Sequence, residues 1–502
     1  MLAGSINTNV SALFALNSLA NTSNTTNQLE QELSSGLAIN SPADNPAGYI
    51  AAQGFQTQIG GVTQATSNAN QAISLVQTAD GAVQQQINLL QQISSIADQA
   101  ANGINSPSEL ASLQQVVSQL QTQVTTISSQ TQFNNTNLLD GTFQGVEFQT
   151  GPNAGQTIQL SIANTAATNI GVNESSAAAA GVYATAGAAT GGVGDNTGAS
   201  YAITATSGGA FTSGSIGVSG SAGGSSFTVS SISESAADIA AAVNATQSHT
   251  NVSAVADTSV AFTVTSGSFT FTLGNGSGGA QTNGVTISAT VTAATQSGLS
   301  PLVQAINAQT SATGITATIN SSDQLVLTQS SGQNISVTGF SGSGTLAAGG
   351  TSTVTLGGGS GDVASATVQG VVTFQSTQSF ALATAASNIG LNTTSTLDSL
   401  AGVNVLTGAG ADSALNIVNF AIQTLENVGG QLGATQQQLQ ATVSNLQTTE
   451  SNLTTAQGVV QDANIPQVTT QLTQEQILQQ AGVSALAQSS TLQQAFLKLL
   501  QS

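Results

Sequence analysis

The sequence predicts a multidomain α+β protein: a coiled-coil stem made of helices from both chain ends, with a mainly β outer region of one or two small domains inserted between them. The first supporting observation is a leucine at every seventh position of the C-terminal part, and the second is helical periodicity over the first 130 residues. The third is a change of composition to Gly, Ser, Thr and Ala between about 176 and 380. The heptad leucines are Leu425, Leu432, Leu439, Leu446 and Leu453. So narrow an apolar seam needs a partner helix, which we expect from the N-terminal segment.

The composition excludes several classes of function. The 502 residues include one Lys, no Arg and one His, against 21 acids, and the net charge is −20. Nucleic acids and anionic membrane surfaces are bound through clustered basic residues, so neither is expected as a partner. Without cysteine there is no disulfide or thiol chemistry, and no apolar run is long enough to predict a membrane span. The first residues lack the basic and apolar regions of a secretory signal peptide, so none is expected.

Three helices are predicted before residue 130. The first, 2–35, ends before Gly36, a residue suited to the left-handed position after a helix. The second spans 47–103, and the third starts behind the capping sequence Ser106-Pro-Ser-Glu109. The short turn between them predicts an antiparallel pair. Their predicted seam residues, apolar at spacings of three and four, are Ile59, Val62, Ile73, Val76, Val83, Ile87, Leu90, Leu110, Leu113, Val117, Leu120 and Val124.

Strand patterns follow the third helix. Thr142–Gln149 and Gln156–Ala163 alternate in polarity around a Gly/Pro/Asn segment, which predicts a hairpin. Farther along, 239–264 and 302–327 share apolar positions without gaps at an offset of 63 residues. We interpret them as an internal repeat in which each copy is a short helix followed by two strands.

Helical periodicity returns from about 381. A helix beginning near Asp412 runs into the leucine heptads, and the segment from Asp462 to Pro466 interrupts it. The last helix, about 470–500, has an apolar face wider than one partner helix covers, which indicates an interface. Its apolar residues include Leu472, Ile477, Leu478, Leu486, Leu492, Phe496 and Leu499, and those at the start of the chain include Ile6, Val10 and Leu13.

No catalytic group of residues is recognisable. His249 lies in a Gly/Ser/Thr-rich background and cannot build a His-based metal site alone, and the Gly-Lys pair of a P-loop never occurs. We interpret the Gly-rich stretches as turns between strands. We therefore expect no enzymatic activity, no cofactor and no resident metal.

Several stretches near the two ends form a recognisable set: Leu33-Ser-Ser-Gly-Leu37, Asp44-Asn-Pro-Ala-Gly48 and Gln476-Ile-Leu-Gln-Gln-Ala-Gly482 are among them. With these stretches, both ends of the chain resemble bacterial flagellin. The resemblance covers about 1–175 and 385–502, and the repeat resembles one inserted in the variable region of many flagellins and hook proteins. It implies a subunit that self-assembles into the filament used for swimming.

The resemblance also implies where each segment lies. Residues 1–40 and 461–502 would be inner-tube helices, 41–175 and 383–460 the helical wall, and 176–382 the exposed variable region. It implies unfolded export by the flagellar type III secretion apparatus to an extracellular filament. The implied partners are further copies, an export chaperone on the C-terminal helix, the filament cap and hook-associated proteins. Two alternatives stay open, a hook–filament junction protein and a surface adhesin displayed on a filament.

Two departures from the family pattern are informative. The family's L-Q-R-I-R-E-L pattern, which an innate immune receptor reads, aligns with Leu90-Gln-Gln-Ile-Ser-Ser-Ile96, so Gln92, Ser94 and Ser95 replace its charged residues. This predicts poor receptor activation. The second departure is the lack of bases: carboxylates titrate near pH 4, so at pH 2–3 the subunit would carry almost no charge, as suits an acidic habitat. Protease evasion or a glycan coating is an alternative reason for that composition.

Overall fold

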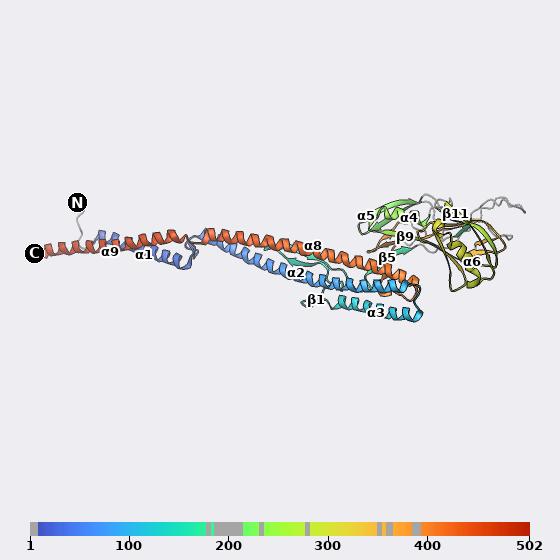
Figure 1. Cartoon of the computed structure of the whole chain (residues 1–502). Helices are drawn as coiled ribbons and strands as arrows, with labels where there is room; N and C mark the ends of the chain where they lie inside the picture. The colour runs from blue at the N-terminus through green and yellow to red at the C-terminus, as the bar shows by residue number, and fades with distance from the viewer. Residues whose placement is uncertain are drawn as a thin grey trace. The chain divides into compact units, whose positions relative to one another are not determined.

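A computed structural model describes residues 9–176, 182–184, 214–229, 235–276, 282–348, 354–357, 365–383 and 393–501. The chain forms two compact units. The first comprises Met1–Asp80, Phe143–Ile162 and Gln431–Ser502, and the second comprises Gly81–Thr142 and Ala163–Gly430. The predicted fold class is confirmed, since helices from both chain ends pack together and the middle of the chain is mainly β (Figure 1).

In the first unit, α1 (Val10–Ser35) lies antiparallel to α9 (Ile465–Gln501) (Figure 1). At one end of the pair, Asn9 Nδ2 donates a hydrogen bond to Ser489 Oγ at 3.0 Å. At the other end, Leu37 and Asp462 form an isolated antiparallel β-bridge. The predicted end of α1 is confirmed, because Gly36 has φ +74° and its N–H bonds to the carbonyl of Glu32. The two helix breaks are thus hydrogen-bonded to each other.

The leucine heptads lie on α8 (Gly408–Gln461), which begins four residues before the predicted Asp412 and ends at the predicted break. Within the first unit their partner is α2 (Pro46–Ala101). Val62 and Ala65 form a buried cluster with Leu446, against which Leu453 packs. Thr63 Oγ1 also donates to Glu450 Oε1 at 3.0 Å. The predicted pairing of an N-terminal helix with the leucine seam is therefore confirmed.

The predicted hairpin is present in the first unit but is shorter at both ends. Its strands β3 (Val146–Gln149) and β4 (Thr157–Leu160) pair antiparallel. The hairpin is held on α2, where Asn68 Nδ2 donates to the carbonyl of Gln149 at 3.0 Å.

In the second unit, α3 (Pro107–Gln130) starts with the predicted capping box. The backbone N–H of Ser106 donates to Glu109 Oε2 at 2.7 Å, and Ser106 Oγ accepts the N–H of Glu109. Gln86 Nε2 on α2 donates to the carbonyl of Val124 at 2.9 Å, which confirms the antiparallel pair. A small hairpin of β1 (Gln132–Phe133) and β2 (Thr136–Asn137) follows α3.

The rest of the second unit is mainly antiparallel sheet. A five-stranded sheet has the strand order β11-β10-β14-β17-β6. An eight-stranded sheet contains the path β12-β13-β9-β18-β5-β20. A three-stranded sheet has the order β19-β7-β8. In the eight-stranded sheet β15 also pairs with β9 and β16. The strands are β5 (Gly171–Ser176), β6 (Val182–Ala184), β7 (Gly214–Gly220), β8 (Gly223–Val229), β9 (Ser253–Val264), β10 (Gly267–Gly276), β11 (Thr282–Val291), β12 (Ile315–Ile319), β13 (Leu325–Gln329), β14 (Asn334–Ser341), β15 (Leu346–Ala348), β16 (Val354–Leu356), β17 (Ala366–Val368), β18 (Val371–Ser376), β19 (Ala381–Leu382) and β20 (Thr396–Ser399). The short helices are α4 (Ala236–Asn244), α5 (Gln247–Thr250), α6 (Gln296–Asn307), α7 (Thr310–Thr313) and the 3-10 helix η2 (Leu400–Gly402).

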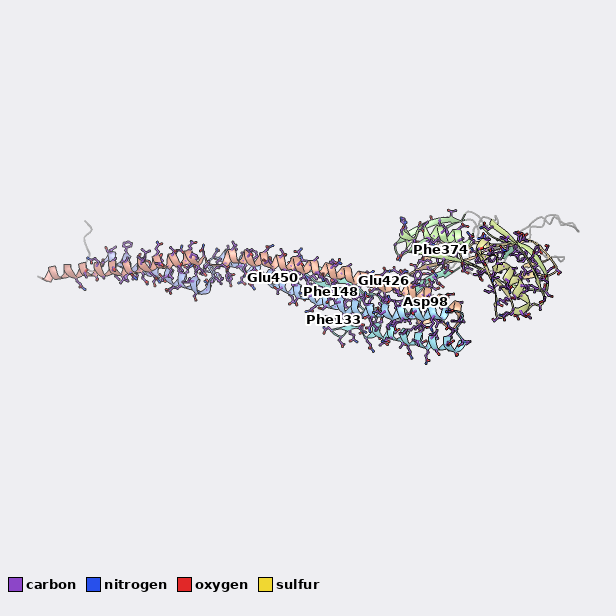
Figure 2. All side chains as sticks on the ribbon, in the orientation of Figure 1. Asp98, Phe133, Phe148, Phe374, Glu426 and Glu450 are labelled. Carbon is purple, nitrogen blue, oxygen red and sulfur yellow. The ribbon has the colours of Figure 1, made fainter. Side chains whose placement is uncertain are left out.

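Two separate apolar cores support these sheets. One contains Phe269, Phe271 and Phe340, and the ring of Phe340 packs against the rings of the other two. The other contains Phe227 and Phe374, with ring centroids 6.2 Å apart (Phe374 is labelled in Figure 2).

Equivalent hydrogen bonds occur 63 residues apart in the two copies of the repeat. Asn244 at the end of α4 exchanges two hydrogen bonds with the backbone of Ala254, at 2.8 and 2.9 Å. Asn307 at the end of α6 exchanges the same two with Ala317, at 2.7 and 2.9 Å. The copies differ afterwards: the second has the two expected strands, β12 and β13, whereas the first has one continuous strand, β9. The expectation of two strands is wrong for the first copy because β9 pairs with β18 and β13 in succession.

Candidate functional site: the helical assembly surface

The leucine seam on α8 is buried along its length. Within the first unit, Leu432 and Leu439 are each 1% exposed, Leu446 is also buried and Leu453 is half-buried. The threonines between them, Thr435 and Thr442 among others, are half-exposed or exposed and donate their hydroxyls to carbonyls four residues earlier at 2.9 Å. Since these hydroxyls are already paired, the seam needs only apolar contact from its partner.

The predicted seam on α2 and α3 is buried to differing degrees. In the first unit Val62 and Val76 are buried, and Ile59 and Ile73 are half-buried. In the second unit the buried residues are Val83, Ile87, Leu90, Val117, Val124 and Leu425, and the half-buried ones are Leu110, Leu113 and Leu120. The sequence reasoning missed other buried alanines on α2, which give little hydrophobic signal: Ala65, Ala72 and Ala79.

Buried glutamines were also missed. Gln86 Nε2 reaches the carbonyls of Val124 and Thr165, and Gln121 Nε2 donates to the carbonyl of Leu400 at 2.7 Å. Gln114 Oε1 accepts the N–H of Val405 at 2.7 Å. These amides tie the segments around 165 and 400–405 to the helices of the second unit. No sequence signal separates them from the many exposed glutamines.

The contact between α1 and α9 is narrow and buries few side chains. Thr26 and Leu29 are the buried residues of α1, and Val468 is buried on α9. Gly482 faces Leu19, since a Cβ at Gly482 would lie 3.6 Å from Leu19 Cδ1. Small residues at a crossing let helices approach closely, but they bury little apolar area.

Large apolar side chains on the same two helices therefore face outward. Val10, Leu13 and Phe14 of α1 are exposed, Phe14 to 73%, and so are Ile477, Leu478 and Val483 of α9, Ile477 to 60%. Leu472 and Leu486 are half-buried. Ile6 and the side chains of Leu492, Phe496 and Leu499 lie outside the described residues. A hollow of about 480 Å³ on α9 is lined by Thr470, Thr473, Gln474, Ile477 and Leu478.

The carboxylates of the chain lie in contrasting environments. Backbone N–H groups of Ser41 and Asn40 lower the pKa of Asp44, those of Ser106 lower the pKa of Glu109, and Thr142 lowers the pKa of Asp140. Burial raises the pKa of Glu174 on β5, with a further contribution from the nearby charge of Asp398, and burial also raises the pKa of Asp257. Others are spread along the long helices, as Figure 2 shows for Asp98 on α2 and for Glu426 and Glu450 on α8.

The stretch from Leu90 to Ile96 presents a polar but uncharged surface. Leu90 and Ile93 are fully buried, Gln92 and Ser95 are exposed, and Ser94 is half-buried. The substituted positions are therefore on or near the surface of α2.

Comparison with known proteins identifies the family. Residues 6–144 match the bacterial flagellin N-terminal helical region, 415–500 match the bacterial flagellin C-terminal helical region, and 268–331 match the flagellin hook IN motif. The chain is 34% identical to B-type flagellin of Pseudomonas aeruginosa over 525 aligned positions, which cover all of both chains. The chain belongs to the bacterial flagellin family. It is a structural subunit of the extracellular flagellar filament and assembles with copies of itself.

Further flagellins match over part of their length. A flagellin of Xenorhabdus nematophila is 41% identical over 161 residues, which are 32% of this chain and 51% of that protein. The solved structure of FliC from Burkholderia pseudomallei shares 18% identity over 73% of this chain and 99% of that chain. Its TM-score of 0.29 is too low for a comparison of the two folds. None of these findings favours the hook–filament junction alternative over the filament subunit. Within the described residues, no helix is long and apolar enough to cross a membrane.

The leucine seam gives a first prediction. Leu439→Ala removes a buried side chain from the seam and should lower the free energy of unfolding by about 2–5 kcal/mol, because it removes apolar burial and leaves a cavity. Thr442→Ala, one turn away, removes only an intrahelical hydrogen bond and should change that free energy by less than about 1 kcal/mol. The measurement is urea unfolding of the full-length monomer followed by far-ultraviolet circular dichroism. Equal losses for the two variants would show that the seam does not stabilise the subunit.

Proposed function

We propose that the apolar side chains left exposed on α1 and α9 are the surface through which the terminal helices of neighbouring subunits contact one another in the filament. The observation that carries the proposal is that, among the described residues, this helix pair buries only Thr26, Leu29 and Val468 and leaves most of its large apolar side chains exposed. An exposed apolar surface of this kind is costly in water, and burial stabilises the assembled state by roughly 25 cal/mol per Å².

In this proposal 1–40 and 461–502 line the inner tube, and 41–175 and 383–460 form the wall around it. Residues 176–382 face outward. The seam residues of α2, α3 and α8 then act within each subunit by packing, without chemical reaction. Their burial supports this role.

We further propose that the subunit is exported unfolded by the flagellar type III secretion apparatus. Before export, a small chaperone would bind the C-terminal segment of the subunit. In the filament, the cap would contact subunits at the growing end and the hook-associated proteins would contact subunits at the basal end. The exposed Ile477, Leu478 and Val483 support a chaperone site on α9, because a free apolar helix face invites aggregation.

The assembly surface can be tested by a double variant, Ile477→Gln with Leu478→Gln. Both side chains are exposed in the subunit, so the free energy of unfolding of the monomer should change little. The critical concentration for polymerisation should rise at least about tenfold, since about 1.4 kcal/mol of lost burial per contact suffices for that factor. Sedimentation and electron microscopy of filaments give the measurement.

The matched control is Gln480→Ala, an exposed polar position on the same helix. It should polymerise as the unchanged protein does. If the apolar double variant also polymerises normally, the exposed face of α9 is not an assembly surface.

The charge of the subunit predicts that filaments are more stable in acid. The pKa values of Glu174 and Asp257 are raised in the folded subunit. These two groups therefore contribute stability at a pH below the ordinary carboxylate pKa, and that contribution is lost as the pH rises through the raised pKa values. The lowered pKa values of Asp44, Glu109 and Asp140 act oppositely: their contribution is present above about pH 4 and is lost as the pH falls through the lowered values. These effects within the subunit oppose each other, so repulsion between subunits should decide the outcome.

We therefore expect filaments in low salt to depolymerise at a higher temperature at pH 3 than at pH 7. High salt should reduce the difference, because it screens repulsion between exposed charges. Light scattering during heating gives the depolymerisation temperature. Greater filament stability at pH 7 would contradict the role assigned to subunit charge.

The altered receptor motif predicts a weak response from the innate immune receptor that reads flagellin. Introducing the family residues, Gln92→Arg, Ser94→Arg and Ser95→Glu, should raise the response, since these positions are exposed or half-buried on α2. A receptor reporter cell line compares both proteins with an ordinary flagellin. A response to the unchanged protein equal to that of the ordinary flagellin would overturn the proposal.

A further inference from the structure

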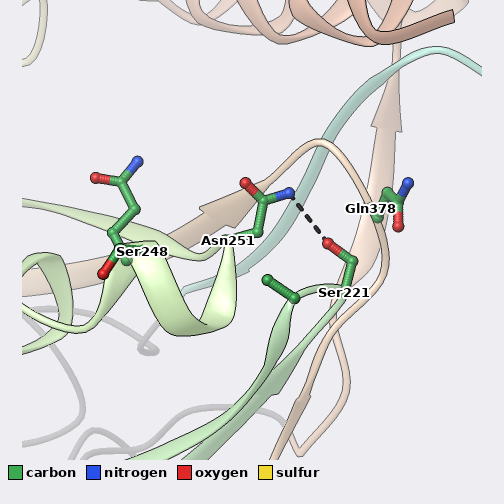
Figure 3. A pocket seen from close by; sticks show the side chains of 6 residues that line it. Ser221, Ser248, Asn251 and Gln378 are labelled. Carbon is green, nitrogen blue, oxygen red and sulfur yellow. Dashed lines mark hydrogen bonds between the residues drawn. The ribbon is translucent and has the colours of Figure 1, made fainter. Parts of the chain in front are cut away.

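A hollow of about 610 Å³ opens in the β-rich part of the second unit (Figure 3). Three segments meet there: the tip of the β7–β8 hairpin, the helix α5 with the residue after it, and the loop after β18. Its lining residues are Ser221, Ala222, Gln247, Ser248, Asn251 and Gln378. Its volume lies in the range of roughly 300–1,000 Å³ typical of small-molecule sites.

Hydrogen bonds fix the three segments to one another. Ser376 is buried, and its Oγ donates to the carbonyl of Asn251 at 2.7 Å and accepts the N–H of Gln378 at 3.3 Å. Asn251 Nδ2 donates to Ser221 Oγ at 3.1 Å, the bond drawn as a dashed line in Figure 3. The walls of the hollow are therefore preformed, which lowers the ordering cost of binding a ligand.

Two glycines allow the hairpin tip to lie directly on α5. A Cβ at Gly220 would collide with the carbonyl oxygen of Thr250, and one at Gly223 would lie 3.1 Å from the carbonyl oxygen of His249. This close backbone approach sets the position of Ser221 at the edge of the hollow.

The second copy of the repeat shows which side chains the fold itself requires. The offset of 63 residues places Gln247 opposite Thr310 and Asn251 opposite Gly314. Asn251 and Gly314 both adopt the left-handed conformation, with φ of +57° and +67°, and both donate their N–H to the carbonyl four residues earlier at 2.7 Å. Glycine suits this conformation best, so the turn has no need of the amide that the first copy carries there.

The amides around the hollow keep hydrogen-bonding capacity. Among the described residues, no side-chain hydrogen bond is made by the amides of Gln247 and Gln378, and no donor reaches Asn251 Oδ1. The amides of Gln247 and Gln378 offer donors and an acceptor, Asn251 offers its Oδ1 as an acceptor, and no charged side chain lines the hollow. Figure 3 shows the amides of Asn251 and Gln378 on opposite sides of Ser221.

We propose that this hollow binds a neutral sugar unit of a glycan. A hydroxyl-rich ligand matches amides and hydroxyls that both donate and accept. The hollow lacks the basic groups that an anionic ligand needs, and Ala222 is the one apolar residue among those that line it, so no large aliphatic or aromatic side chain is present to hold a hydrophobic ligand. The net charge of −20 further disfavours acidic ligands. The exposed β region would then attach the filament weakly to glycan-bearing surfaces, and many identical sites along one polymer would add avidity.

Saturation-transfer NMR on the full-length monomer tests the proposal, with glucose, galactose, mannose and N-acetylglucosamine as probes and N-acetylneuraminate as the charged comparison. At least one neutral sugar should bind with a Kd on the order of 1 mM. Asn251→Gly and Gln247→Thr introduce the residues of the second copy, and each should weaken binding about fivefold, as expected for one lost hydrogen bond. Gln304→Ala, an exposed amide of the second copy, should leave binding unchanged.

Any of three results overturns the proposal. The first is that no neutral sugar binds the unchanged protein more tightly than it binds the double variant Asn251→Gly with Gln247→Thr. The second is that N-acetylneuraminate binds more tightly than every neutral sugar, and the third is that both single variants bind as the unchanged protein does. Thermal unfolding verifies that each variant is folded. If Asn251→Gly is unstable, Gln247→Thr and Gln378→Ala decide the question, since both side chains are exposed and neither makes a hydrogen bond within the described residues.

Discussion

The structure depends on one contact between helices from opposite ends of the chain. In this contact, one leucine per two helical turns is buried against the partner helix. Leu439 and Leu446 lie on α8, and within the first unit α2 supplies Val62 and Ala65 to cover that seam. A seam this narrow stabilises the helix pair only when the two helices are in register. The hydrogen bond between Thr63 and Glu450 marks that register. The chain between the paired helices must leave the stem and return to it. The strands β5 to β20 all lie in this connection.

The polar groups of the subunit are hydrogen-bonded almost entirely without basic side chains. Threonine hydroxyls along α8 bond to carbonyls of their own helix, and Gln86 and Gln121 bond to backbone carbonyls inside the second unit. Each such neutral bond contributes about 0.5–1.5 kcal/mol and, unlike an ion pair, depends little on pH or salt. These neutral contacts remain when the carboxylates become neutral, as the proposed stability of the filament in acid requires.

Sequence patterns predicted elements whose cause is local. Gly36 after α1, the capping box of Ser106 and Glu109, and the break after α8 each depend on neighbouring residues, so the sequence was sufficient for them. The hairpin of β1 and β2 was missed, although Asn134 and Asn135 supply the two positive φ angles that its turn requires. Some buried alanines of α2 were missed because a methyl group gives little hydrophobic signal on either face of a helix.

By itself the sequence determined the helices, their breaks, the leucine seam and the flagellin family, since periodicity, capping and motif spacing are properties of the chain alone. Only the tertiary structure decided which face of α1 meets α9, because that contact buries Leu29 and places Gly482 against Leu19 but leaves other apolar residues of the two helices exposed. It also decided that Ser221, Asn251 and Gln378 surround one hollow. These residues are far apart in the chain, and their proximity comes from strand pairing and backbone hydrogen bonds that no local pattern specifies.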